Sequence, residues 1–142
     1  MITRSLTSSV KHVWSKDGAL DRASPAFDLA AYHRDGDMAH LPCLPGCAPT
    51  VFTLARLPRR TFVYCADLDG FRRVCEAVAY GVREVAGFVV DGQELSLAHQ
   101  KSDLGQRLTE ASMDALFDPD LFGELAGRVL ELSQIDPTRG QG

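Results

Sequence analysis

The strongest structural signal in the chain lies in residues 69–85, which read Asp69-Gly70-Phe71-Arg72-Arg73-Val74-Cys75-Glu76-Ala77-Val78-Ala79-Tyr80-Gly81-Val82-Arg83-Glu84-Val85. The apolar residues that recur there at helical spacing are Phe71, Val74, Cys75, Val78, Val82 and Val85. At about 100° per residue these side chains share one stripe. The side chains opposite the stripe are Arg73, Tyr80 and Glu84. The pattern predicts an amphipathic helix that runs to Val85 and packs by one face.

A strand is predicted before this helix. Thr50–Leu57 is rich in β-branched and aromatic residues, which favour strands. Pro49 precedes it and Pro58 follows it, so both ends of the strand are marked. Residues 61–68, between this strand and the helix, fit either a helix or a strand.

A β-hairpin is predicted after the helix. Residues 87–90 and 93–97 flank Asp91-Gly92. This dipeptide is favoured in two-residue hairpin turns because both positions accept a positive φ. The following residues, 98–106, are predicted to be a polar connection.

Two more helices are predicted near the end of the chain. Thr109 can cap a short helix that runs to Leu116. Asp118-Pro119 reads as an N-cap followed by the first helical residue, and that helix ends before Asp136-Pro137. Its predicted core stripe is Leu121, Phe122, Leu125, Val129 and Leu132. We therefore expect residues 50–142 to form an α+β domain, with a hairpin or short sheet packed on two or three amphipathic helices and a short polar C-terminal tail.

The first part of the chain, residues 1–49, is predicted to be a long irregular N-terminal arm. Residues 10–14 alternate like a short strand that ends at Trp14, which is a candidate contact residue. A short helix is predicted over Pro25–His33, with Ser24 as its N-cap. Prolines and glycines punctuate the remainder. An arm that is ordered needs a surface to lie on.

The last helix carries two glycines in its interior. Gly123 and Gly127 lie four residues apart and opposite the core stripe, with Leu130 beside Gly123 in angle. Each interior glycine costs about 1 kcal/mol relative to alanine, so the pair calls for a reason. Either the positions tolerate glycine on the surface, or another backbone approaches closely there, from the arm or from a neighbouring subunit. The second interpretation makes Gly123, Gly127 and Leu130 candidate interface residues.

Length, charge and hydropathy limit the functions open to the chain. Its 142 residues fit one domain, and its net charge of −4 provides no basic field for nucleic acid. No apolar run has the length of a membrane span, and the polar start lacks the apolar region of a signal peptide. We therefore expect a protein that stays in the cytosol and has no membrane partner.

A metal-binding loop is one alternative. His40, Cys43 and Cys47 lie within eight positions, and Cys65 could supply a fourth ligand for tetrahedral zinc. These cysteines lack the paired two-residue spacing typical of zinc sites, and Cys75 lies on a core stripe. Isolated reduced thiols are the interpretation that we favour, with no metal and no cofactor.

Catalytic motifs are missing from the sequence. It has no nucleophile elbow, phosphate-binding loop, zinc-protease helix or dinucleotide fingerprint. Its acidic pairs lie beside glycines in turn-like stretches, at Asp35/Asp37 and Asp67/Asp69. Its scattered histidines are predicted to be solvated: His12, His33 and His99. We therefore expect no enzymatic activity, and an unrecognised small enzyme is kept as an alternative.

An arginine group could contact a partner. Its members are Arg56, Arg59, Arg60, Arg72 and Arg73, and Phe62, Tyr64 and Phe71 could stack bases beside them. Arg59 and Arg60 could equally form a solvated patch or anchor an acidic neighbour. The second interpretation makes both candidate interface residues.

Several stretches of the second half carry a family resemblance. They are Pro49-Thr50-Val51-Phe52-Thr53-Leu54, the segment ending in Val82-Arg83-Glu84-Val85-Ala86-Gly87-Phe88, Asp91-Gly92 with Leu95, Leu108-Thr109, Leu121-Phe122-Gly123-Glu124-Leu125-Ala126 and Leu130-Glu131-Leu132-Ser133. Their order resembles that of small tailed-bacteriophage proteins of the tail assembly chaperone type. The long arm and the cysteine loop depart from that pattern.

The resemblance implies a function without catalytic residues. Proteins of this type bind other phage proteins while a tail or particle is assembled. We expect a small phage structural or assembly protein in the virion or the host cytoplasm, as a homo-oligomer or a component of a larger assembly. A metal-stapled binding module is the first alternative to this expectation.

Overall fold

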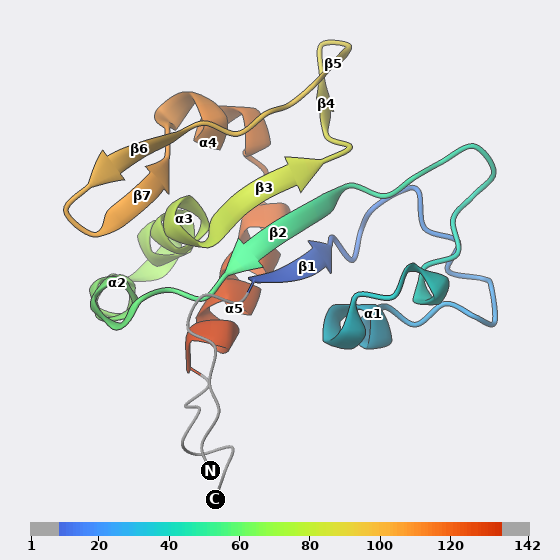
Figure 1. Cartoon of the computed structure of the whole chain (residues 1–142), viewed down its shortest axis with the longest axis horizontal. Helices are drawn as coiled ribbons and strands as arrows, with labels where there is room; N and C mark the ends of the chain where they lie inside the picture. Colours follow the sequence, from blue (N-terminus) through green and yellow to red (C-terminus); the bar gives the residue numbers. More distant parts are fainter. Residues whose placement is uncertain (1–8, 135–142) are drawn as a thin grey trace, which may run out of the picture.

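A computed structural model describes residues 9–134 of the chain (Figure 1). In chain order its elements are β1 (Ser9–Val13), α1 (Leu29–Asp35), the 3₁₀ helix η1 (Met38–His40), β2 (Val51–Ala55), α2 (Arg59–Ala66), α3 (Gly70–Gly81), β3 (Val82–Ala86), β4 (Val89–Val90), β5 (Gln93–Glu94), β6 (His99–Ser102), β7 (Gly105–Leu108), α4 (Glu110–Leu116) and α5 (Pro119–Gln134). The expected class, a small α+β domain, is confirmed.

The main sheet has three antiparallel strands in the order β1-β2-β3. The central strand, β2, lies within the predicted strand Thr50–Leu57, and its residues Phe52 and Leu54 are buried. The predicted strand at residues 10–14 corresponds to β1, which pairs with β2 from Ser9 opposite Ala55 to Val13 opposite Val51. The described part of the arm therefore contributes a full edge strand to the sheet.

The predicted helix through Val85 is wrong in its last four residues. Helix α3 ends at Gly81, and the chain continues directly into β3. Val82 pairs with Leu54, and Val85 pairs with Phe52 across the sheet. The reason is tertiary, because β-branched valines fit a paired strand and β2 supplies the partners.

The main core lies between the sheet, α3 and α5, and α5 covers one face of the sheet (Figure 1). Its largest fully buried members include Phe52, Leu54, Val78, Val82, Leu108, Leu116, Phe122, Leu125 and Val129. The two C-terminal helices are confirmed. Thr109 caps α4, and Asp118 Oδ1 accepts a hydrogen bond from the Leu121 N–H at the start of α5.

Three segments in the second half clarify or correct the predictions. Residues 61–68, for which no choice was made, fall largely in helix α2. The predicted polar connection 98–106 is wrong, because His99–Ser102 and Gly105–Leu108 pair as a hairpin. That hairpin was missed since its exposed strands carry few apolar residues. The predicted Asp91-Gly92 turn is confirmed, with φ of 51° and 80°, although the strands it joins are only two residues long.

The described part of the arm has a small core of its own. Its buried members are Val13, Leu20, Tyr32 and Leu41. The predicted helix Pro25–His33 starts too early, because α1 begins at Leu29 and Asp28 Oδ1 caps it by accepting from the Ala31 N–H. No helix within residues 9–134 has both the length and the apolar character needed to cross a bilayer.

Candidate interaction surfaces

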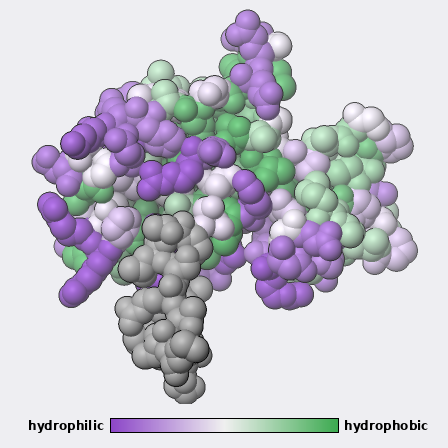
Figure 2. Space-filling view, viewed as in Figure 1, coloured by the Kyte–Doolittle hydropathy of each residue, from purple (hydrophilic) through white to green (hydrophobic). Residues whose placement is uncertain are grey.

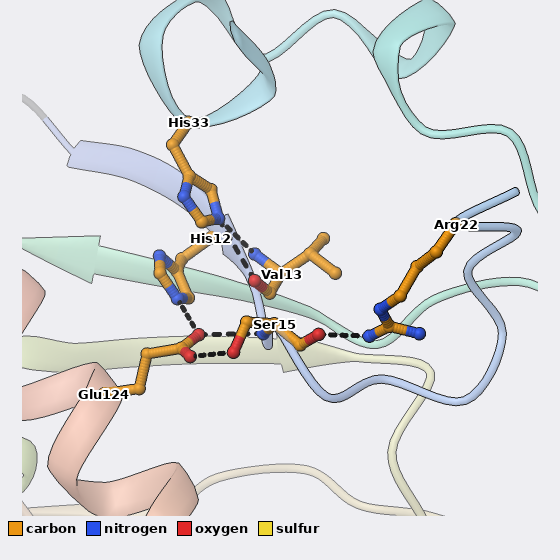
Figure 3. A network of polar contacts seen from close by, with 6 residues as sticks. All are labelled: His12, Val13, Ser15, Arg22, His33 and Glu124. Atoms are coloured by element: carbon orange, nitrogen blue, oxygen red, sulfur yellow. Dashed lines mark hydrogen bonds and ion pairs between the residues drawn. The ribbon is translucent and has the colours of Figure 1, made fainter. Parts of the chain in front are cut away.

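A polar junction joins the arm to the last helix (Figure 3). Glu124 of α5 accepts hydrogen bonds from the arm on both carboxylate oxygens. Its Oε2 lies 2.7 Å from His12 Nε2 and 2.9 Å from the Ser15 backbone nitrogen, and its Oε1 accepts from Ser15 Oγ. Arg22 donates in turn to the Ser15 carbonyl oxygen. These contacts fix the end of β1 against α5.

The electrostatics of the junction favour an ionised Glu124. Partial burial of the carboxylate raises its pKa, but the hydrogen bonds from His12 and Ser15 outweigh this effect and lower the pKa to about 2. Because the carboxylate accepts, His12 Nε2 carries the proton, and the buried Nδ1 has no partner among the described atoms. The ionised Glu124 carboxylate thus accepts hydrogen bonds from the His12 ring, the Ser15 backbone N–H and the Ser15 hydroxyl.

The prediction that the histidines are solvated is wrong for His12, which is buried, and His33 and His99 are both half-buried. His12 is 3% exposed, and its ring stacks on His33 of α1 with 4.0 Å between centroids. Burial, and then the nearby His12 ring, lower the pKa of His33. The alternation that placed Val10, His12 and Trp14 on one face of the strand was the signal for burial.

The junction holds structure together and lacks the geometry of a hydrolase triad. In such a triad the histidine lies between the nucleophile and the carboxylate. Here Glu124 lies between Ser15 and His12, so His12 does not take the Ser15 proton. Neighbouring contacts reinforce the structural role. Lys16 Nζ lies 2.8 Å from Asp120 Oδ2, and Arg128 donates to the His33 carbonyl oxygen at 3.2 Å.

The two α5 glycines lie beside the surface that holds the arm. The arm docks on the flank formed by Asp120, Glu124 and Arg128. Gly123 and Gly127 are exposed, and a Cβ built on either meets no described atom within 4 Å. The described part of the arm therefore does not explain either glycine. Leu130, the third residue predicted there, is half-buried and packs on the main core.

The other predicted interface residues lie on separate surfaces. Trp14 is half-buried and lines a small apolar pocket of about 210 Å³ with Phe52 and Phe88. Arg59 and Arg60 are exposed in the first turn of α2. The structure thus does not gather the predicted interface residues into one patch.

The metal-site candidates are not brought together either. Cys65 is buried in the main core, whereas Cys43 packs on the small core of the arm. His40 Nε2 lies 3.0 Å from Asp35 Oδ2, and Cys47 is exposed as a free thiol. Within residues 9–134, no three His, Cys, Asp or Glu side chains are grouped so that they could hold a metal ion.

Sequence reasoning missed a groove along the outer edge of β3. The groove measures about 590 Å³ and is lined by Arg83, Glu84, Val85, Glu94, Leu95, Ser96, Leu97 and His99. β3 ends the sheet, so this edge faces the groove and pairs with no strand within residues 9–134. His99 Nε2 lies 3.2 Å from the Val82 carbonyl oxygen, and Glu94 accepts from the Gly87 N–H. Hydrophobic surface lies between the projecting β4–β5 hairpin and the body of the molecule (Figure 2).

Comparison with protein-family models, with curated proteins and with solved structures finds no match for this chain. The functional argument therefore depends on the surfaces described above.

Proposed function

We infer that this chain is a non-enzymatic bacteriophage structural or assembly protein that binds other particle or tail subunits. The family resemblance provides the biological context, and the virion or the host cytoplasm is the expected location. The observation that carries the proposal is the outward strip of α5, defined here as the exposed face at Gly123 and Gly127.

The described fold does not explain why the outward strip contains two glycines. A helix of this length loses about 1 kcal/mol for each interior glycine relative to alanine. Both positions have free space for a Cβ, so packing within residues 9–134 does not require glycine. Close approach of a partner backbone gives the glycines a reason, since a Cβ would hold the partner away.

The edge of β3 supports the same class of function. An unpaired strand edge presents backbone N–H and C=O groups that an extended segment of another protein can pair with. The groove beside β3 gives such a segment room, at about 590 Å³. Two separate surfaces therefore favour a polypeptide partner.

The test is the native mass of the purified chain, alone and mixed with purified candidate phage tail proteins, by light scattering after gel filtration. We expect a complex or closed oligomer that the Gly127→Leu variant loses. As the control, Ala111→Leu places a leucine at an exposed position of another helix, α4, and should leave the complex intact. A chain that stays monomeric with every candidate partner, or a Gly127→Leu variant that assembles normally, contradicts the proposal.

A further inference from the structure

A second groove lies where the chain passes from β2 into α2. It measures about 460 Å³ and is lined by Arg56, Leu57, Pro58, Arg59, Phe62 and Ser133. Leu57 forms part of its wall and is itself 2% exposed, while Phe62 packs on the main core. We call it the arginine groove.

The walls of the arginine groove are fixed to one another. Ser133 Oγ accepts a hydrogen bond from the Leu57 N–H at 2.9 Å and donates to the Val129 carbonyl oxygen at 2.7 Å. These contacts tie the connection before α2 to the last turn of α5. The groove is thus preformed, so a ligand would not have to order it.

The positive charge of the groove has no carboxylate partner within residues 9–134. Arg56 and Arg59 line it, and Arg60 follows in the same turn. Arg107 and Arg128 elsewhere are paired with carboxylates, whereas the ion pairs found within residues 9–134 include neither Arg56 and Arg59 of the groove nor the neighbouring Arg60. Among the described residues, these arginines thus form a basic cluster without carboxylate partners, in a chain with a net charge of −4.

The start of α2 adds to this positive potential. Pro58 is its N-cap and forms no side-chain cap, and its first turn has no acidic residue. The N-terminal end of a helix carries partial positive charge, so basic side chains there are unfavourable without an anion. Hydrophilic residues gather over α2, at the left of the view in Figure 2.

We propose that the arginine groove binds an acidic segment of a partner polypeptide, whose apolar side chain lies against Leu57 and Phe62 and whose carboxylates pair with Arg56 and Arg59. Guanidinium groups bind carboxylates through paired hydrogen bonds. This assigns a partner chemistry to a surface separate from the outward strip of α5. Its test is therefore independent of the Gly127 variants.

An acidic polypeptide fits the groove better than a nucleic acid does. The lining between the arginines is aliphatic, with a leucine and a proline, and only one aromatic ring is present for stacking. The acidic remainder of the chain repels a long polyanion. A short acidic segment with an apolar anchor satisfies both the charge and the lining.

The experiment measures binding of fluorescein-labelled peptides to the full-length protein by fluorescence anisotropy. Each peptide carries Asp and Glu residues around a central Leu, Phe or Trp, and matched peptides carry Asn and Gln instead. The protein variants are Arg56→Gln, Arg59→Gln and, as a control of equal charge change, Arg34→Gln. Arg34 is exposed on α1 and far from the groove in the chain. Circular dichroism checks that each variant is folded.

We expect at least one acidic peptide to bind with a Kd below about 1 mM and its neutral counterpart to bind at least tenfold more weakly. Arg56→Gln and Arg59→Gln should each weaken binding about tenfold, because hydrogen bonds between charged groups are lost. Arg34→Gln should change it less than about twofold. The proposal is overturned if no acidic peptide binds, or if Arg34→Gln weakens binding as much as the groove variants. It is also overturned if a labelled oligothymidylate binds through Arg56 and Arg59 while the peptides do not.

Discussion

Gly81 at the end of α3 packs directly against Val129 of α5. A Cβ built on Gly81 would lie 2.4 Å from Val129 Cγ1 and 2.5 Å from Cγ2, well inside van der Waals contact. Val129 is fully buried and β-branched, so its side chain has little freedom to move aside. The absence of a side chain at Gly81 therefore sets how closely the two main helices approach.

Gly81→Ala should destabilise the protein by about 1–3 kcal/mol, because the added methyl overpacks the helix contact. Gly127→Ala is the matched control, since its Cβ meets open space. It should stabilise the isolated chain by about 0.5–1 kcal/mol through helix propensity. Urea unfolding measures both values. Equal effects of the two substitutions would contradict the packing argument.

A double variant isolates the contact itself. Val129→Ala alone should destabilise the chain by leaving a cavity. In Gly81→Ala with Val129→Ala, the new methyl occupies part of that cavity, so the combined loss should be smaller than the sum of the two single losses. Additive losses in the same urea experiment would show that the two residues do not interact.

Glu124 should make the protein sensitive to acid. Its pKa is about 2 in the folded chain and near 4.5 in the absence of contacts. A lowered folded pKa adds stability above about pH 4.5, and this contribution is lost as the pH falls from there toward 2. Glu124→Gln should cost about 1–3 kcal/mol at pH 7 and should flatten the dependence of the unfolding temperature on pH in that window.

The control for this pH experiment is Glu131→Gln, which removes an exposed carboxylate of the same helix. It should shift the unfolding temperature little at any pH, because exposed ion pairs contribute at most about 1 kcal/mol. An acid profile that Glu124→Gln leaves unchanged would mean that the junction with His12 and Ser15 does not stabilise the fold.

The four cysteines should differ sharply in their reactivity toward a thiol reagent such as DTNB. Burial raises the pKa of the Cys65 thiol to about 11, and nearby Glu76 adds to this shift. Cys65 should therefore react only when the chain unfolds. Cys47 is exposed and should react first, so Cys47→Ser should remove the fast phase. Fast labelling of Cys65 in the folded protein would contradict its placement in the core.

A metal chelator should leave the unfolding temperature unchanged. The structure separates Cys65 from the loop that holds Cys43 and Cys47, and the His40 side chain is hydrogen-bonded to the Asp35 carboxylate. A structural zinc ion would instead link folding to metal, and its removal would lower stability by several kcal/mol. Zinc that copurifies with the chain, together with destabilisation by a chelator, would contradict this prediction and favour the alternative of a metal-stapled binding module.

The sequence predicted best those helices and turns that begin or end at a capping or turn-forming residue. Asp118 and Thr109 cap their helices as expected, and Asp91-Gly92 forms its turn. The prediction of a helix through Val85 failed because β-branched valines also favour strands. A register shift at Thr53/Leu54 lets Val82 pair with Leu54 and Val85 with Phe52 despite their helical spacing. Periodicity within one segment contains no information about a partner strand.

The surfaces were harder to predict than the elements. The sequence singled out Gly123 and Gly127 for close packing, whereas the tightest glycine contact among the described residues is at Gly81. Its neighbour Val129 lies far along the chain, so no local pattern links them. The contacts of Glu124 were likewise not predicted, because the donors His12 and Ser15 lie more than one hundred positions away in the sequence. The groove beside β3 depends on a sheet edge that only the strand order defines.

The junction between His12 and Glu124 sets an order of events during synthesis. The two residues are 112 positions apart, so β1 leaves the ribosome long before the carboxylate that holds it. Residues of α5 also fill the main core, and they are the last described segment to be translated. Translation at about 5–20 residues per second leaves the earlier segments without this cover for several seconds. The nascent chain therefore completes the packing of its main core and of this junction only after α5 has left the ribosome, when this helix becomes available to both the sheet and the arm.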